Sequence, residues 1–224
     1  MTKRHQRAGF VVDKRDADGM TLLMTAAQTG EYQCLLECLE SCADINAVDN
    51  AGNNALIHAV RAKQDTIAVV LMNKGIDPAK QTSGGTTALI EACASQLPEV
   101  IERLLKKKVP LNAQNRSGNT ALMVACLLND GWAACRIAEE GADFETLKNK
   151  KDMTALAIAR TFMKRDDLVC FEEVIEKRRA AQRLVDQAAA EERAKTLEKN
   201  VEEATILQRA IKPMKPVALK LKPQ

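Results

Sequence analysis

A repeat with a period of 33 residues constrains the fold of this chain more than any other feature of its sequence. The segment RSGNTALMVAC, residues 116–126, has close counterparts in ADGMTLLMTAA, residues 17–27, NAGNNALIHAV, residues 50–60, and SGGTTALIEAC, residues 83–93. Two independent sets of residues step by 33, the glycines Gly19, Gly52, Gly85 and Gly118 and the leucines Leu23, Leu56, Leu89 and Leu122. A fixed period near 33 residues indicates a stacked array of small units rather than one closed core.

A fifth copy, KDMTALAIAR at residues 151–160, is out of step by one residue. Leu156 follows the leucine of the fourth copy by 34 residues, whereas Gly75 and Gly141 each follow the leucine of their own copy by 19. The extra residue is therefore expected within residues 142–151.

Within each copy the residue pattern predicts a turn, a short helix, a second turn and a longer helix. In the second copy these are a turn at residues 49–53, a first helix at 54–61 and a second helix at 66–73, which Gly75 closes. Apolar residues recur at helical spacing in both helices. Aromatic residues make up only 3% of the 224 residues, so Ala, Leu, Met and Cys must fill the layers between copies.

The repeated unit resembles that of the ankyrin-repeat family. That unit is often written Gly-x-Thr-Pro-Leu-His-x-Ala and ends in Gly-Ala-Asp-x-Asn. This chain has GMTLLMTA with CADINA, GNTALMVA with GADFET, and GNNALIHA with GIDPAK. The resemblance implies an all-α fold, a solenoid of helix-turn-helix repeats with β-turn or hairpin loops. Every copy lacks the proline and the histidine of the pattern, so the array is expected to be less rigid than a consensus one.

Four segments are expected along the chain. Residues 1–12 form a basic N-terminal segment, and residues 13–179 form the array of five repeats. Residues 167–212 contain neither Pro nor Gly and predict one long helix, of which residues 180–212 are a charged portion expected to project from the array. Residues 213–224 are a basic tail rich in Pro and Lys, interpreted either as a disordered tail or as an added edge strand or linear motif.

The resemblance also implies where a partner binds. In ankyrin-repeat proteins the binding surface is concave and consists of the turn tips and the exposed faces of the first helices. The matching positions of this chain include Met20, Asn53, Arg61, Thr86, Asn119, Leu127, Leu128, Met153 and Phe162. Leu127, Leu128 and Phe162 are apolar where solvent favours polar side chains, and an exposed apolar cluster marks a partner site. In the alternative interpretation, the C-terminal segment folds back over these three side chains.

A second binding element is expected in the C-terminal helix. Its apolar side chains recur at intervals of three and four residues, at Leu197, Val201, Ala204, Leu207 and Ile211. This stripe is shorter than three heptads, too short to establish a coiled coil by itself. Helix pairing that depends on a partner is the favoured interpretation.

Seven cysteines, an odd number, mostly occupy positions where other copies carry apolar residues, which predicts reduced thiols in an intracellular protein. The spacing of Cys34, Cys38 and Cys42 could in principle present three thiolates to zinc. However, Cys34 and Cys38 align with Ile, Val and Leu at helix-core positions of other copies. Packing is therefore the favoured interpretation, and no metal or other cofactor is predicted.

Several functional classes receive no support from the sequence. The two histidines, His5 and His58, lie far apart, and neither a phosphate-binding loop followed by Lys-Ser/Thr nor a His-Glu-x-x-His pattern occurs, so no catalysis and no small-molecule substrate is predicted. A net charge of +3 is too small to indicate nucleic acid. No apolar run approaches the length of a membrane span. Residues 1–12 lack the apolar stretch of a secretory signal, although their lack of acids leaves a mitochondrial presequence open.

The sequence thus predicts a cytoplasmic, non-catalytic adaptor or scaffold. One protein partner is expected on the concave face, and a second on the C-terminal helix and tail. Two alternatives stay open, a structural subunit built into a large cytoskeletal or organellar assembly, and a bacterial ankyrin effector that acts in a host cell.

Overall fold

The computed structural model describes residues 13–210, with side chains at every position in this range except 205 and 207–210. The predicted basic segment 1–12 and tail 213–224 lie outside the described residues. The helices are α1 (Leu22–Thr29), α2 (Tyr32–Glu40), α3 (Ala55–Arg61), α4 (Asp65–Asn73), α5 (Ala88–Ser95), α6 (Pro98–Lys106), α7 (Ala121–Leu127), α8 (Gly131–Glu139), α9 (Ala155–Phe162) and α10 (Arg165–Ala210). The chain divides into two compact units, Met1–Ile175 and Glu176–Gln224.

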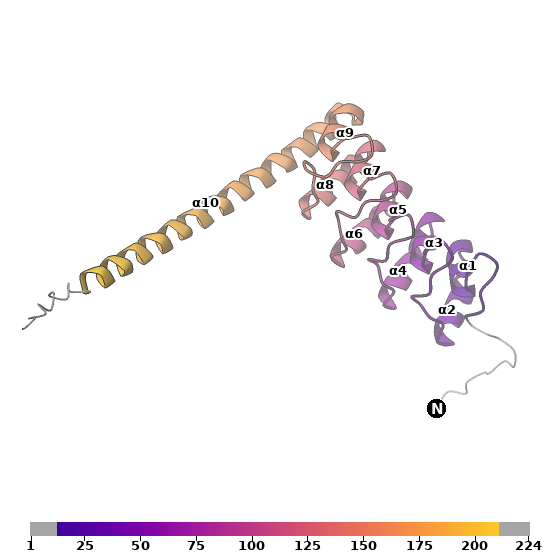
Figure 1. Ribbon diagram of the computed structural model, residues 1–224. Helices are drawn as coiled ribbons and strands as arrows, with labels where there is room; N and C mark the ends of the chain where they lie inside the picture. Colours follow the sequence, from indigo (N-terminus) through magenta and orange to yellow (C-terminus); the bar gives the residue numbers. More distant parts are fainter. Residues whose placement is uncertain (1–12, 211–224) are drawn as a thin grey trace, which may run out of the picture. The chain divides into compact units, whose positions relative to one another are not determined.

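The first unit is a stack of five repeats, each made of two helices (Figure 1). The first helices α1, α3, α5, α7 and α9 pack against one another in one row, and the second helices α4, α6 and α8 form a more loosely packed row beside them. The predicted repeat of turn, short helix, turn and longer helix is therefore confirmed, with helix bounds within one residue of those predicted for the second repeat.

Each first helix is capped at its N-terminus by a threonine or an asparagine, the residue just before the position of the missing proline. The N-cap residues are Thr21, Asn54, Thr87, Thr120 and Thr154. In every case the side-chain oxygen accepts a hydrogen bond from the backbone N–H three residues later, at 3.0–3.4 Å. Such a cap satisfies one of the otherwise unpaired N–H groups of the first turn.

Each turn is held by a polar side chain that folds back onto its own backbone. In repeat two, Asp49 Oδ1 accepts from the N–H groups of Ala51 and Asn53, at 2.9 and 2.8 Å. The residues at the same position in the other repeats, Asp16, Thr82, Asn115 and Asn149, accept from the N–H groups two and four residues later in the same way. This side-chain turn gives the five loops one shape, which lets them stack.

The glycine of the turn is required by the neighbouring repeat. Gly52 has a φ of +80°, and a Cβ at this position would lie 2.9 Å from the backbone nitrogen of Ser83 in the next turn. That nitrogen donates a hydrogen bond to Ala51 O at 2.9 Å and so links the two turns. Repeat five carries Asp152 at the same position, with a φ of +60°. The turn at Asp152 is the last one described in the row, so its Cβ meets no following turn.

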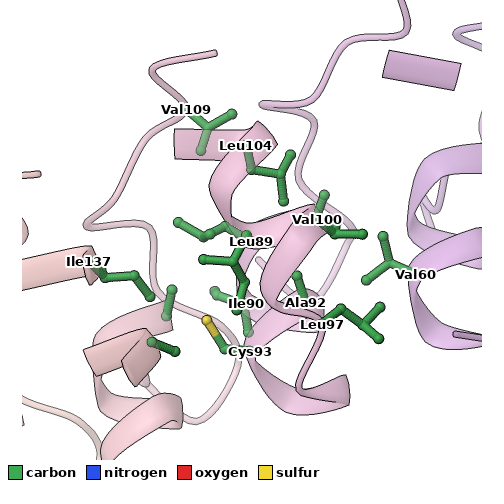
Figure 2. Close-up of a cluster of buried hydrophobic side chains, with 14 of the residues drawn as sticks. Val60, Leu89, Ile90, Ala92, Cys93, Leu97, Val100, Leu104, Val109 and Ile137 are labelled. Carbon is green, nitrogen blue, oxygen red and sulfur yellow. The ribbon is translucent and has the colours of Figure 1, made fainter. Parts of the chain in front are cut away.

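The core lies between successive repeats. The recurring leucines are buried, with exposures of 0–1% in the first four repeats and 8% at Leu156. Figure 2 shows one such layer, in which Val60 of repeat two and Ile137 of repeat four flank the side chains of repeat three. Because each repeat buries its apolar side chains both between its own two helices and against the neighbouring repeats, stability is shared along the stack.

The second helix of repeat five does not stop where the others do. Gly75 and Gly141 end α4 and α8 with φ values of +91° and +109°, and the N–H of the following residue bonds back to the helix, as Ile76 N does to Leu71 O at 3.2 Å. Repeat five has Ile175 at this position. A β-branched residue strongly disfavours a left-handed backbone, so the helix continues to Ala210. The predicted long helix is confirmed and begins two residues earlier than expected.

The extra residue of repeat five lies between Asp143 and Asn149. Asp143 corresponds to Asp77, and Asn149 corresponds to Thr82. Asp77 precedes Thr82 by five positions, whereas Asp143 precedes Asn149 by six. The insertion therefore falls within the segment predicted for it. Its backbone is anchored at Phe144, whose carbonyl oxygen accepts from Leu156 N at 3.0 Å.

Candidate functional site

The positions predicted to bind a partner lie on the turn tips and on the exposed sides of the first helices. We call this surface the first-helix face. In repeats one to three its predicted residues are mainly polar, whereas in repeats four and five most of them are apolar.

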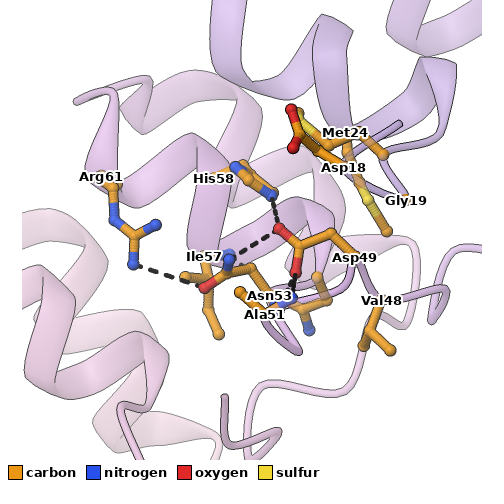
Figure 3. A network of polar contacts seen from close by, with 12 residues as sticks. Asp18, Gly19, Met24, Val48, Asp49, Ala51, Asn53, Ile57, His58 and Arg61 are labelled. Atoms are coloured by element: carbon orange, nitrogen blue, oxygen red, sulfur yellow. Dashed lines mark hydrogen bonds and ion pairs between the residues drawn. The ribbon is translucent and has the colours of Figure 1, made fainter. Parts of the chain in front are cut away.

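A buried polar network underlies the first-helix face in repeat two (Figure 3). The ring Nε2 of His58 donates to Asp49 Oδ2 at 2.9 Å, and the side chains of both residues are 7% exposed. Asn53 Nδ2 donates to the same oxygen at 2.7 Å. Burial would raise the pKa of Asp49, but the hydrogen bonds from Asn53 and His58 outweigh it and hold the pKa below its ordinary value. The network joins the turn to α3.

Arg61 extends this network to the surface. Its Nε donates to Glu91 Oε1 on α5 at 2.8 Å, and its Nη2 donates to Asn53 Oδ1 at 3.5 Å. The Arg61 side chain is 48% exposed, whereas Glu91 is 17% exposed. Asn53 itself is only 6% exposed. Asn53 therefore orients Arg61 from below, and Arg61 presents a partly ordered guanidinium that can donate to a carboxylate or carbonyl of a partner.

The other turn-tip positions are half-buried. Met20 and Met153 pack against the core, and Thr86 lies beside the N-cap of α5. Asn119 accepts a hydrogen bond from Asn149 Nδ2 at 2.9 Å, which links the turns of repeats four and five. These side chains leave only part of their surface for a partner.

Three large apolar side chains stand exposed at the ends of neighbouring first helices. Leu127 is 37% exposed, Leu128 45% and Phe162 51%. Leu128 and Phe162 occupy the same position of repeats four and five, at the ends of α7 and α9, which pack side by side. We call these three residues the apolar patch.

The sequence pattern did not predict a hollow whose lining includes the four residues that directly follow Leu128 of the apolar patch in the chain. It has a volume of about 450 Å³ and is lined by Gln96, Pro98, Asn129, Asp130, Gly131, Trp132 and Asp167. Trp132 is 43% exposed. Its counterparts in repeats one to three are Gln33, Thr66 and Glu99, all polar. Comparison of the repeats at this position would have revealed Trp132 as an unusual surface residue.

Asn129 fixes the loop that separates the apolar patch from this hollow. Its backbone is left-handed, with a φ of +55°. Its Oδ1 accepts from the backbone N–H of Lys164, and its Nδ2 donates to Asp167 Oδ2 at 3.3 Å. The side chain of one residue in repeat four thus holds the second helix of repeat five, which stiffens the support of the apolar patch.

In the second unit every described side chain from residue 180 onward is exposed. Leu197 is 64% exposed and Val201 60% exposed. Leu207 belongs to α10, but its side chain lies outside the described residues, as does the whole of Ile211.

The three cysteines considered for zinc differ in their surroundings. Cys34 is half-buried, Cys38 is buried, and Cys42 is exposed just beyond the end of α2 with a φ of +62°. Burial, and after it the neighbouring Cys34, raise the pKa of Cys38 to about 12. Such an environment suits a protonated core thiol rather than a metal-bound thiolate. Within residues 13–210 no three His, Cys, Asp or Glu side chains are grouped closely enough to hold a metal ion.

Across the part of the chain that the structure describes, none of the helices has the length and apolar character required to cross a membrane. Comparison with curated protein sequences gives no match. A family model described as "Ankyrin repeats (3 copies)" matches residues 3–82 and again residues 78–148. The matched residues make up more than half of the chain and carry the turns and helices of the first four repeats described above. The chain therefore belongs to the ankyrin-repeat family.

Proposed function

We propose that the chain is a non-catalytic adaptor that binds a protein partner on the first-helix face, with the apolar patch as its main anchor. Ankyrin repeats are generally protein–protein interaction modules. The observation that carries the proposal is the exposure of Leu127, Leu128 and Phe162 at the ends of adjacent helices. Large apolar side chains that gather at one place on a surface are a common mark of a protein interface.

Two features make the first-helix face suitable for tight binding, one at the apolar patch and one in repeat two. Asn129 ties its supporting loop to repeat five, so little order has to be gained on association. Farther along the first-helix face, Arg61 is already oriented by Asn53 and Glu91. Aromatic and arginine side chains supply much of the binding energy at interfaces. The partner is therefore expected to bring apolar anchors to the patch and an acceptor group to Arg61.

The second contact is assigned to α10 beyond the array. Leu197 and Val201 are exposed on a helix that is otherwise rich in charged residues, and a solvated helix of this composition does not require large apolar side chains. They suit a partner helix that packs along the same stripe. The same observation favours the alternative of a subunit built permanently into a larger assembly. Residence in a reducing intracellular compartment remains part of the proposal.

The experiment is affinity purification with the full chain as bait, followed by mass spectrometry of the captured proteins. Leu128→Glu should remove the partner of the first-helix face, because a charge would have to be buried against apolar atoms. Thr29→Glu is the matched control, since Thr29 is exposed at the same position of repeat one. Far-ultraviolet circular dichroism should be the same for both variants.

A chain that ends at residue 179 should keep the partner of the array and lose the partner of α10. Capture by Leu128→Glu at the level of the wild-type chain would place the interface elsewhere. New partners on truncation, together with protection of Phe162 in the full chain, would instead support the interpretation that the C-terminal segment covers the apolar patch.

A further inference from the structure

Two thiols from neighbouring repeats lie in contact. The Sγ atoms of Cys135 on α8 and Cys170 in the first turns of α10 are 3.6 Å apart, although 35 positions separate the residues in sequence. Cys135 is 9% exposed, and Cys170 is exposed. Both belong to the first compact unit. Cys170 is therefore the residue that reagents in solution can reach, and its sulfur is in contact with that of the buried Cys135.

We propose that Cys135 and Cys170 are an oxidative modification site that forms an intrachain disulfide with hydrogen peroxide as the oxidant. The Cys170 thiol loses its proton, and the resulting thiolate attacks one peroxide oxygen. The O–O bond breaks, and the departing hydroxide takes up that proton and leaves as water, so that Cys170 becomes a sulfenic acid. The Cys135 thiol gives up its proton as its sulfur attacks the sulfenic sulfur, the S–O bond breaks, and the departing hydroxide takes up this proton and leaves as a second water. Two thiols and one peroxide thus give one disulfide and two waters.

The geometry requires only a small movement. A disulfide bond is about 2.05 Å long, so the sulfurs must approach each other by about 1.5 Å. Both residues are on helices, α8 and α10, that belong to consecutive repeats. Closing this gap requires rotation of both side chains about χ1 and backbones close enough for the Cα–Cα distance of about 4.4–6.8 Å that a disulfide needs.

The surroundings assign different roles to the two cysteines. Burial, together with the neighbouring Cys170 thiol, raises the pKa of Cys135 to about 12. Because the thiolate is the reactive form, Cys135 reacts slowly with dissolved oxidant by itself. Once Cys170 is oxidised, however, Cys135 is already in contact with the electrophilic sulfur, which gives a high effective concentration. Cys170 is thus the peroxide-sensitive thiol and Cys135 the resolving thiol.

The disulfide would stabilise repeat five against local unfolding. Repeat five has a neighbouring repeat on one side only, and terminal repeats of such stacks open most readily. The covalent link would join its second helix to that of repeat four, on the same pair of repeats that Asn129 holds by hydrogen bonds. Oxidation would therefore suppress opening of repeat five.

The test uses the fully reduced full-length chain, treated with a small excess of hydrogen peroxide. The intact mass should fall by roughly 2 Da, the mass of the two hydrogens lost in the disulfide. Trypsin should release peptides 117–136 and 166–177 joined, and fragmentation should assign the bond to Cys135 rather than to Cys126 of the same peptide. The melting temperature should rise by about 5 to 15 °C and return to its starting value on reduction.

Three variants complete the design. Cys170→Ser should give no joined peptides, and Cys135→Ser should accumulate a Cys170 sulfenic acid that dimedone traps. Cys42→Ser removes another exposed thiol and should leave the joined peptides unchanged. The proposal is overturned if the wild-type chain carries Cys170 as sulfinic acid with no joined peptides. It is equally overturned if the joined peptides form as fast in urea as in the native chain. Both of these outcomes are read on the wild type and do not depend on how a variant folds.

Discussion

Replacement of Gly52 by Ala tests whether stacking of the turns holds the array together. The left-handed backbone at Gly52, with a φ of +80°, should cost an alanine about 1–2 kcal/mol. Its Cβ would also lie 2.9 Å from the backbone nitrogen of Ser83, and relief of this overlap must move the next turn. Overpacking of this kind costs about 1–3 kcal/mol. The free energy of unfolding should therefore fall by about 2–5 kcal/mol in total.

Gly75→Ala in the same repeat is the matched control. Gly75 has a φ of +91°, but no atom lies within 4 Å of the position that its Cβ would take. This variant should lose only the backbone contribution of about 1–2 kcal/mol. Both can be measured by urea unfolding followed by circular dichroism at 222 nm, the standard helix wavelength. A loss in Gly52→Ala no larger than that in Gly75→Ala would refute the inference that contact between turns stabilises the array.

Three further predictions follow from individual side chains. Leu122→Ala removes a fully buried interlayer side chain, and chemical denaturation should show about 2–5 kcal/mol lost. Asp49→Asn should cost about 1–3 kcal/mol at pH 7, because a hydrogen-bonded charge is lost. Since folding lowers the pKa of Asp49, its contribution is present above the unfolded pKa of about 3.9 and is lost as the pH falls through the folded pKa, so the difference from wild type should shrink below pH 4. Cys38, whose pKa is raised to about 12, should react with a thiol reagent only as fast as the array unfolds, and rapid reaction of the native chain would contradict its assignment to the core.

The fold was largely predictable because the same short pattern of turn, cap and core residues recurs in successive repeats. Periodic leucines identify the interlayer core, and Leu122 is indeed fully buried. The continuation of α10 also had a local signal, since Ile175 replaces the glycine that ends α4 and α8. In each case the relevant interaction lies within one repeat or between equivalent positions of two repeats, so alignment of the copies is sufficient to find it.

The candidate site was less predictable because its details depend on contacts between different positions. Asn53 was placed on the partner surface by its register, yet Asp49 and Arg61 bind its amide and it is buried. The bond from His58 to Asp49 joins a helix to a turn nine residues away, and no repeat pattern signals it. Trp132 differs from the polar residues at its position in repeats one to three, but it lies on a second helix, outside the turn tips and first helices that the family pattern marks as the binding surface.

Asp152 has a consequence for how the number of repeats can change. Tandem duplication of any one of the first four repeats would also copy its turn glycine. The new repeat could therefore pack its turn against the following turn without a clash. A duplicate of repeat five would instead place its turn against the Cβ of Asp152, at a position where the other repeats have no Cβ. Lengthening at that end therefore needs two genetic events, the duplication and a change of Asp152 to glycine. Natural or engineered variants with additional repeats are accordingly expected to gain them internally, by duplication of one of the first four repeats.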